Sequence, residues 1–105
     1  MADISRQKQI TTCAYDSMGL CQMAEANLEV MAKLVSSFYG WSWSPEDVAD
    51  MGKSVLNEEV AFNRSAGLSP ATDRLPDFFR EEPLAPHEGK FDIPPSQIEK
   101  VMDFK

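Results

Sequence analysis

The densest set of chemically useful side chains lies in the segment Asp16-Ser17-Met18-Gly19-Leu20-Cys21. A carboxylate such as that of Asp16 accepts two parallel hydrogen bonds, which suits a flat heterocycle with adjacent N–H and amino donors, such as the edge of a pterin or guanine. The thiolate of Cys21 is a soft metal ligand. These residue types predict a ligand contact at Asp16 and a metal contact at Cys21.

A purely structural interpretation of the same segment stays open, and the spacing alone favours it. In that interpretation Asp16 caps the following turn and Cys21 is buried as a small hydrophobic side chain. Gly19 marks a tight turn or the end of a helix. Gly19 and Leu20 then lead into the next expected helix, whose first backbone amides would face an anionic group.

Few other residues could complete a catalytic or metal site. The single histidine, His87, lies in a proline-rich stretch, where we expect it to be solvated. No metalloprotease, phosphate-loop, dinucleotide-binding or paired-cysteine motif occurs, so no residue is assigned a catalytic role. A four-iron cluster takes four cysteine thiolates, and this chain has two, Cys13 and Cys21. The chain could therefore supply one ligand to a cluster whose other ligands come from elsewhere.

The composition limits the class of protein. The 105 residues form one domain, and a hydrophobic content of 43% is ordinary for a soluble globular chain. The net charge of -7 disfavours binding to nucleic acid or to an anionic membrane. No apolar stretch approaches the roughly 20 residues that span a bilayer, and no leader peptide is visible at the start. We therefore expect a cytoplasmic protein with no nucleic-acid or membrane partner.

The periodicity of apolar residues predicts an all-α fold, a small bundle of about four helices with a proline-rich, irregular C-terminal third. The expected helices cover residues 3–15, 24–39, 45–66 and 97–104. Residues 76–80 are expected to form a helical turn, and residues 83–93 an extended surface segment. All of residues 1–105 are assigned to a single helical domain.

Several residues predict where the helices end and cross. Gly40 is placed for a left-handed helix cap, and Gly67 for the end of the third helix. The third helix should begin at Ser44 and Pro45, which are favourable cap and first-turn residues. Gly52 inside that helix predicts a close helix crossing. Trp41 and Trp43 are expected to fill the seam between two helices, and a stacking platform for a ligand is the less favoured interpretation.

The order of these signals resembles the C-terminal region of the aldehyde ferredoxin oxidoreductase family, over residues from about 7 to 105. Asp16 to Cys21 is similar to the family motif D-x-x-G-L-C. Further similar pieces are Phe38-Tyr39-Gly40-Trp41, Ser44-Pro45-Glu46-Asp47, Ala61-Phe62-Asn63 with Gly67, Asp73-Arg74-Leu75-Pro76, Phe79 and Glu81-Glu82-Pro83-Leu84. The chain departs from the family pattern F-N-x-R-x-G, because Ser65 occupies the arginine position and Arg64 comes one residue early.

The resemblance implies a role for each residue of the motif. Family members hold tungsten, or sometimes molybdenum, between two pterins beside a 4Fe-4S cluster, and oxidise aldehydes to carboxylic acids with ferredoxin as electron acceptor. By position, Asp16 would bind a pterin ring, Gly19 and Leu20 would shape that contact, and Cys21 would be the fourth cluster ligand. Cys13 has no matching role.

The resemblance also implies that this chain is a C-terminal fragment of a longer oxidoreductase. The fragment would be inactive and free of cofactor alone, with the upstream domains of the parent enzyme as partners and a homodimer of the parent possible. The alternative is a cofactor-free helical interaction module, in which the apolar stripes would bury each other completely. A zinc or thiol protein built on Cys13 and Cys21 is the least favoured hypothesis, because their spacing matches no structural zinc pattern.

Overall fold

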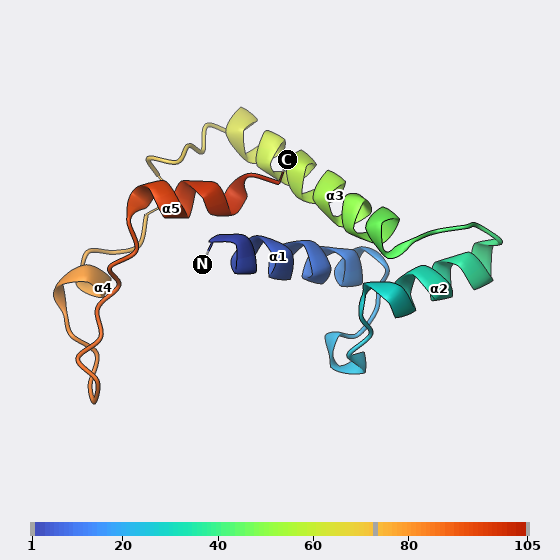
Figure 1. The fold of residues 1–105 in the computed structure, drawn as a ribbon. Coiled ribbons are helices and arrows are strands. Elements are labelled where there is room, and N and C mark those ends of the chain that lie inside the picture. The colour runs from blue at the N-terminus through green and yellow to red at the C-terminus, as the bar shows by residue number, and fades with distance from the viewer. Residues whose placement is uncertain (1, 73, 105) are drawn as a thin grey trace.

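A computed structural model of the chain describes residues 2–72 and 74–104. Three long helices are followed by short helical turns (Figure 1). The elements in order are α1 (Ala2–Ser17), the 3-10 turn η1 (Gln22–Ala24), α2 (Leu28–Tyr39), α3 (Pro45–Ser65), α4 (Phe78–Glu81), α5 (Pro95–Glu99) and the 3-10 turn η2 (Lys100–Met102). The described residues contain no strand beyond an isolated bridge between Leu84 and Gly89. The predicted all-α class is confirmed.

The start of α2 differs from the sequence prediction, which placed it at residue 24. Ala24 instead closes η1, and Glu25 follows with a φ of 50°, which interrupts any helix. Asn27 then caps α2, because its side-chain oxygen accepts a hydrogen bond from the backbone N–H of Val30 at 2.9 Å. The helix therefore begins at Leu28, after the cap, and ends at Tyr39, with Gly40 at a φ of 72° as the predicted left-handed cap.

The start of α3 follows the predicted chemistry in full. The hydroxyl of Ser44 accepts a hydrogen bond from the backbone N–H of Asp47 at 3.2 Å, and the Asp47 carboxylate accepts one from the backbone N–H of Ser44 at 2.7 Å. Pro45 occupies the first helical position. This reciprocal capping box fixes the direction of α3 as the chain leaves the tryptophan segment.

Helices α1 and α3 cross closely at Gly52. A Cβ atom at this position would lie 2.6 Å from the carbonyl oxygen of Ile10, inside van der Waals contact. Only glycine lets the two backbones approach this far, so the predicted close crossing is confirmed.

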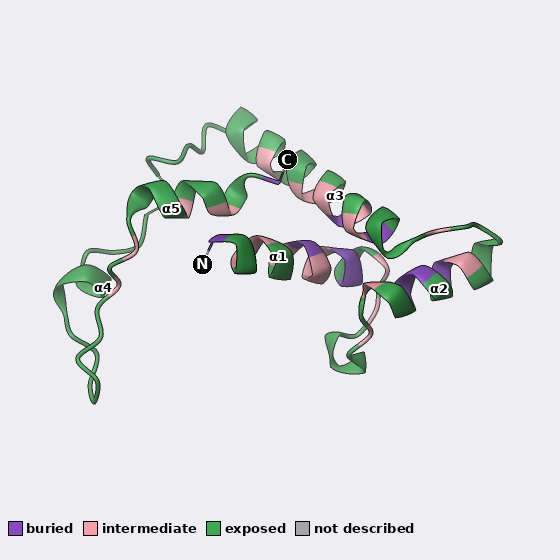
Figure 2. Ribbon diagram, viewed as in Figure 1, coloured by how far each residue is buried: buried purple, intermediate pink, exposed green. Residues whose placement is uncertain are grey.

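The core lies where α1, α2 and α3 meet (Figure 2). Its buried members are Ala14, Tyr15, Met31, Ala32 and Val48. The hydroxyl of Tyr15 donates to the carbonyl oxygen of Ala26, which ties the loop before α2 to this core.

The tryptophans behave differently from each other. Trp43 packs half-buried against the core, as predicted. The same prediction is wrong for Trp41, which is 50% exposed and stacks on Tyr39 with ring centroids 4.8 Å apart. One indole therefore packs against the core, and the other lies outside it.

The C-terminal third is irregular, as predicted, although two details differ. The last helical segment starts at Pro95 rather than 97, and after α5 and η2 it ends at Met102. The segment 83–93 is exposed but not fully extended, because the backbone N–H of Leu84 donates to the carbonyl oxygen of Gly89 at 2.9 Å and closes a turn. Phe104 is buried, and Arg6 donates to the carbonyl oxygen of Asp103 at 3.0 Å, so the chain end lies on α1.

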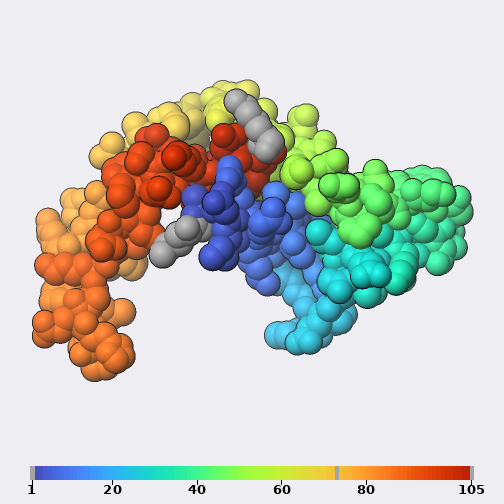
Figure 3. Space-filling view, in the orientation of Figure 1, coloured from blue at the N-terminus to red at the C-terminus, as the bar shows by residue number. Residues whose placement is uncertain are grey.

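The molecule as a whole is open. Figure 3 shows α2 and the α4 region at opposite ends of an arched body. The radius of gyration is 17.2 Å, whereas a compact domain of this length has about 13 Å. The accessible surface is 7943 Å², against about 5,900 Å² for a compact monomer of this mass. No helix among the described residues is long and apolar enough to cross a membrane.

Candidate functional site

The segment from Asp16 to Cys21 forms the C-terminal end of α1 and the turn after it. Gly19 has a φ of 67°, in the left-handed region. Its backbone N–H donates to the carbonyl oxygen of Asp16 at 3.1 Å, and the backbone N–H of Leu20 donates to that of Tyr15 at 3.0 Å. This pair of bonds is a Schellman cap, which needs a residue that tolerates positive φ at the Gly19 position. The motif glycine is therefore explained by the backbone.

Leu20 anchors the turn by packing. Its partly buried side chain lies against the core cluster that contains Tyr15. A hydrophobic contact between these two cap positions commonly accompanies a Schellman cap. The amides of Gly19 and Leu20 are thus occupied within the chain.

Cys21 follows the cap in an extended conformation, with φ of -76° and ψ of 126°. Its thiol is free and exposed, so the structural interpretation that buries this residue is wrong. Its carbonyl oxygen accepts a hydrogen bond from the N–H of Ala24 at 2.9 Å, which holds η1 next to it. An accessible thiol on an ordered turn can act as a metal ligand.

Asp16 is exposed on the last turn of α1. Its backbone carbonyl takes part in the cap, whereas its carboxylate makes no hydrogen bond or ion pair with the described residues. The interpretation in which the side chain caps the next turn is therefore wrong, since both carboxylate oxygens remain available to a ligand.

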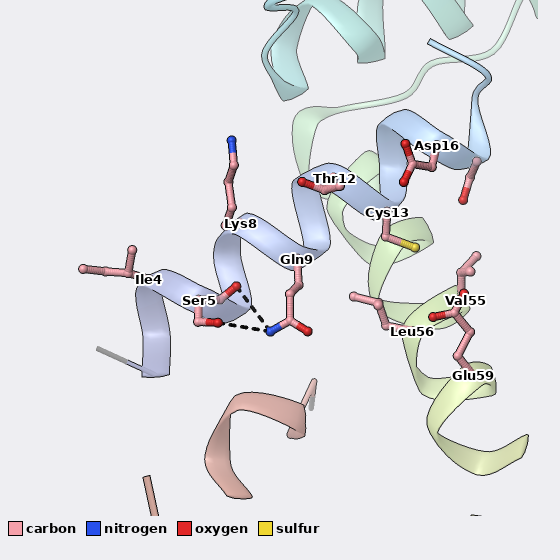
Figure 4. Close-up of a pocket in the computed structure, with 11 residues that line it drawn as sticks. Ile4, Ser5, Lys8, Gln9, Thr12, Cys13, Asp16, Val55, Leu56 and Glu59 are labelled. Atoms are coloured by element: carbon pink, nitrogen blue, oxygen red, sulfur yellow. Dashed lines mark hydrogen bonds between the residues drawn. The ribbon is translucent and has the colours of Figure 1, made fainter. Parts of the chain in front are cut away.

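Asp16 also lies at one end of a groove between α1 and α3, of about 810 Å³ (Figure 4). Cys13 lines the same groove, and its sulfur points toward α3. From α3 the groove is lined by Val55, Leu56 and Glu59. Gly19, Leu20 and Cys21 are not among the lining residues. The sequence motif is thus divided, with its carboxylate on the groove and its thiol beyond the helix end.

The groove keeps Cys13 in its neutral form. Burial raises the pKa of the Cys13 thiol, and the negative charges of Glu59 and Asp16 raise it further, against the opposing effect of a hydrogen bond from Ser17. A neutral thiol is a poor nucleophile and a poor metal ligand. The sequence analysis did not predict this groove. Gly52 was the residue that could have indicated it, because a close crossing there sets Cys13 against residues one and two turns further along α3.

The described residues contain no group of three or more His, Cys, Asp or Glu side chains that could hold a metal ion. A metal centre that uses Cys21 would therefore draw its other ligands from outside this part of the chain. The same holds for a zinc site based on Cys13 and Cys21.

The comparison with known proteins gives one match. Residues 1–103 match the model of a protein family described as aldehyde ferredoxin oxidoreductase, domains 2 & 3. No curated protein and no solved structure matches the chain.

Proposed function

The chain belongs to the aldehyde ferredoxin oxidoreductase family, and we propose that it is the C-terminal helical part of an enzyme that oxidises an aldehyde to a carboxylic acid and passes the electrons to ferredoxin. The observation that carries the proposal is the family match over residues 1–103. The D-x-x-G-L-C segment supports it, because the turn leaves one carboxylate and one thiol free at its two ends.

The free carboxylate and the free thiol each fit part of one family cofactor. The free carboxylate of Asp16 can accept the paired N–H and amino donors of a pterin. Nothing lies within 4 Å of where a Cβ atom on Gly19 would be, so the turn is open to a neighbouring ring. Cys21 offers one accessible thiol group, and a 4Fe-4S cluster takes four cysteine ligands. We therefore assign Asp16 to the pterin and Cys21 to the cluster.

In the complete enzyme, Asp16 would hold a pterin of the tungsten or molybdenum cofactor and Cys21 would hold the 4Fe-4S cluster, and these groups would supply the redox chemistry that links the aldehyde to ferredoxin. The residues of this chain hold and orient the cofactors. Asp16 positions a pterin ring through its carboxylate, Gly19 and Leu20 set the direction of the turn, and Cys21 binds one iron. None of them moves a proton or attacks the substrate.

The open shape supports the proposal that other domains of a longer enzyme cover this chain. Its accessible surface of 7943 Å² exceeds that of a compact monomer by about 2,000 Å², which is more than the roughly 800 Å² that each partner buries in a standard protein interface. The partners proposed on this basis are the upstream domains of the same enzyme. A homodimer of that enzyme would add a further contact.

Iron content in two cysteine variants tests the ligand assignment. The longest chain that carries this segment would be purified without oxygen from cells supplied with tungstate and molybdate, and its iron, tungsten and molybdenum measured. We expect Cys21→Ala to lose cluster iron and the matched Cys13→Ala variant to keep it. Equal iron in both variants would refute the role of Cys21. Aldehyde-dependent reduction of a viologen dye, retained in Cys13→Ala and lost in Cys21→Ala, tests the reaction itself.

The alternative of a cofactor-free interaction module predicted that the apolar stripes bury each other completely. They do not, because Phe38 at the end of the α2 stripe is 80% exposed and Phe62 on α3 is 73% exposed. The structure thus favours a chain with uncovered surfaces over a self-contained module.

A further inference from the structure

The loop between α1 and α2 carries Cys21 and has little side-chain anchorage of its own. Residues 21–25 are all exposed, and in Figure 2 the loop projects away from the helices. Within the loop, only the end residues Leu20 and Ala26 pack against the core, and both are half-buried. The position of the Cys21 thiol is therefore set at the two ends of this loop.

Inside the loop, backbone hydrogen bonds hold the chain together as one piece. The N–H of Ala24 donates to the carbonyl oxygen of Cys21 at 2.9 Å, and the N–H of Glu25 donates to that of Gln22 at 3.3 Å. Glu25 then reverses the chain with a φ of 50°. Because both bonds stay within the loop, they fix its shape but not its place on the protein.

Tyr15 holds both ends of the loop. Its backbone carbonyl oxygen accepts a hydrogen bond from the N–H of Leu20 at 3.0 Å, and its side-chain hydroxyl donates to the carbonyl oxygen of Ala26. Among the residues that the structure describes, no other hydrogen bond joins residues 20–26 to the rest of the chain. One buried residue thus connects the start and the end of the loop to the core.

The hydroxyl of Tyr15 is the part of this side chain that core packing does not explain. The residue is 6% exposed and belongs to the core cluster, where a phenylalanine ring would fill the same space. A buried hydroxyl costs free energy unless it is hydrogen-bonded. Its partner, the carbonyl of Ala26, has no helical donor, because the N–H of Val30 donates to the side chain of Asn27 instead. The hydroxyl therefore serves the placement of the loop.

We propose that Tyr15 is a positioning residue for Cys21. Its carbonyl and its hydroxyl hold the two ends of the loop, so the thiol of Cys21 stays in one place before any ligand binds. This inference rests on the proposed function, in which Cys21 is a ligand of the iron–sulfur cluster. A ligand that is already in position loses less conformational freedom when it binds, and this strengthens its hold on the metal.

A nitroxide label on Cys21 tests the positioning without any cofactor. The full chain would carry Cys13→Ala, so that Cys21 is the only thiol to react. Tyr15→Phe removes one hydroxyl and keeps the ring, and we expect it to narrow the lines of the label's spectrum because the loop moves more freely. The matched control is Tyr39→Phe, since Tyr39 is the other tyrosine and is 59% exposed. Equal spectra in the two variants would overturn the proposal.

A second label position separates loosening of the loop from a general loss of structure. With both cysteines replaced by alanine, Ser54→Cys places the nitroxide at an exposed position of α3. We expect Tyr15→Phe to leave the spectrum of this label unchanged. Equal narrowing at both positions would show that Tyr15 supports the whole fold and would overturn its role as a positioning residue for Cys21.

Iron release tests the role of Tyr15 toward the cluster. The longest chain that carries this segment would be purified without oxygen and treated with an iron chelator. We expect Tyr15→Phe to release iron roughly tenfold faster than Tyr39→Phe, as loss of a residue that orients a metal ligand commonly does. Equal rates, with iron lost from Cys21→Ala, would overturn the role of Tyr15 and leave the ligand assignment standing. Iron retained in Cys21→Ala would refute the ligand assignment, and the role of Tyr15 toward the cluster with it.

Discussion

The backbone N–H of Leu20 donates to the carbonyl oxygen of Tyr15 across 3.0 Å, and this bond sets the turn that separates Asp16 from Cys21. The two residues between which the chain reverses, Gly19 and Leu20, are committed to the backbone cap and the core. Asp16 and Cys21 are left free for ligands. Changes at Gly19 should therefore act on the fold, and changes at Asp16 or Cys21 on binding.

The first prediction concerns Gly19. Gly19→Ala should lower the free energy of unfolding by about 1 to 2 kcal/mol, because a side chain at a φ of 67° is strained. The cost is conformational only, since nothing lies within 4 Å of the added Cβ atom. Urea unfolding followed by circular dichroism measures it. Gly89→Ala is the control, because its site is equally open but does not have a positive φ. Equal effects of the two changes would contradict the Schellman interpretation.

The second prediction concerns Gly52, where the cost is steric. Alanine is the better helix former by about 1 kcal/mol, yet Gly52→Ala should destabilise the chain. The new methyl group would lie 2.6 Å from the carbonyl oxygen of Ile10, so α1 and α3 must separate. Overpacking of this kind costs about 1 to 3 kcal/mol. Ser54→Ala, at an exposed position of the same helix, should be neutral or slightly stabilising. A Gly52→Ala protein more stable than the parent would show that the helices do not cross there.

The third prediction concerns acid stability through the capping box of α3. Hydrogen bonds from Ser44 hold the pKa of Asp47 below its ordinary value of 3.8. A lowered carboxyl pKa stabilises the fold above the ordinary value, and this contribution is lost as the pH falls through the folded pKa. Ser44→Ala should cost about 1 kcal/mol at neutral pH, and its unfolding should depend less on pH below 3.8 than that of the parent. Parallel pH profiles for the two proteins would contradict the assignment.

The fourth prediction concerns the two thiols. Cys21 is exposed, whereas Cys13 is half-buried in the groove and its pKa is raised above 9.0 by burial and by nearby carboxylates. A disulfide reagent should modify the native chain in two phases, and Cys21→Ser should remove the fast one. Raising the pH toward the pKa of Cys13 should speed the slow phase, because only the thiolate reacts. Glu59→Gln should speed it as well, since one of the charges that raise the pKa is gone. A fast phase that survives Cys21→Ser would assign the accessible thiol to Cys13.

Local chemistry made most helix ends predictable from sequence. Ser44, Pro45, Gly40 and Gly67 act through hydrogen bonds and dihedral angles of their immediate neighbours, and α2 and α3 end as those residues indicate. The start of α2 differs from the prediction by four residues, because Asn27, a favourable cap residue, begins the helix at Leu28 rather than at residue 24.

The burial of each apolar face was less predictable, because it depends on what lies opposite. Phe38 continues the spacing of the buried α2 stripe, yet no described residue reaches far enough to cover it. Trp41 and Trp43 are two residues apart and differ in the same way. The division of the motif between a groove and a free turn likewise follows from the crossing at Gly52, which joins residues some 40 positions apart in the chain.

The Schellman cap of α1 has a twin at the end of α3. The backbone N–H of Leu68 donates to the carbonyl oxygen of Asn63 at 3.0 Å and that of Gly67 to Arg64 at 3.0 Å, over the sequence Arg64-Ser65-Ala66-Gly67-Leu68-Ser69. The two ends differ where chemistry would occur, with Arg64 in the place of Asp16 and Ser69 in the place of Cys21. The end of α3 thus provides the same backbone cap without the carboxylate and the thiol. The double variant Arg64→Asp with Ser69→Cys would place the same two groups on the same backbone cap at the end of α3. Comparing ligand binding at the two turns would separate the contribution of the turn itself from that of its surroundings.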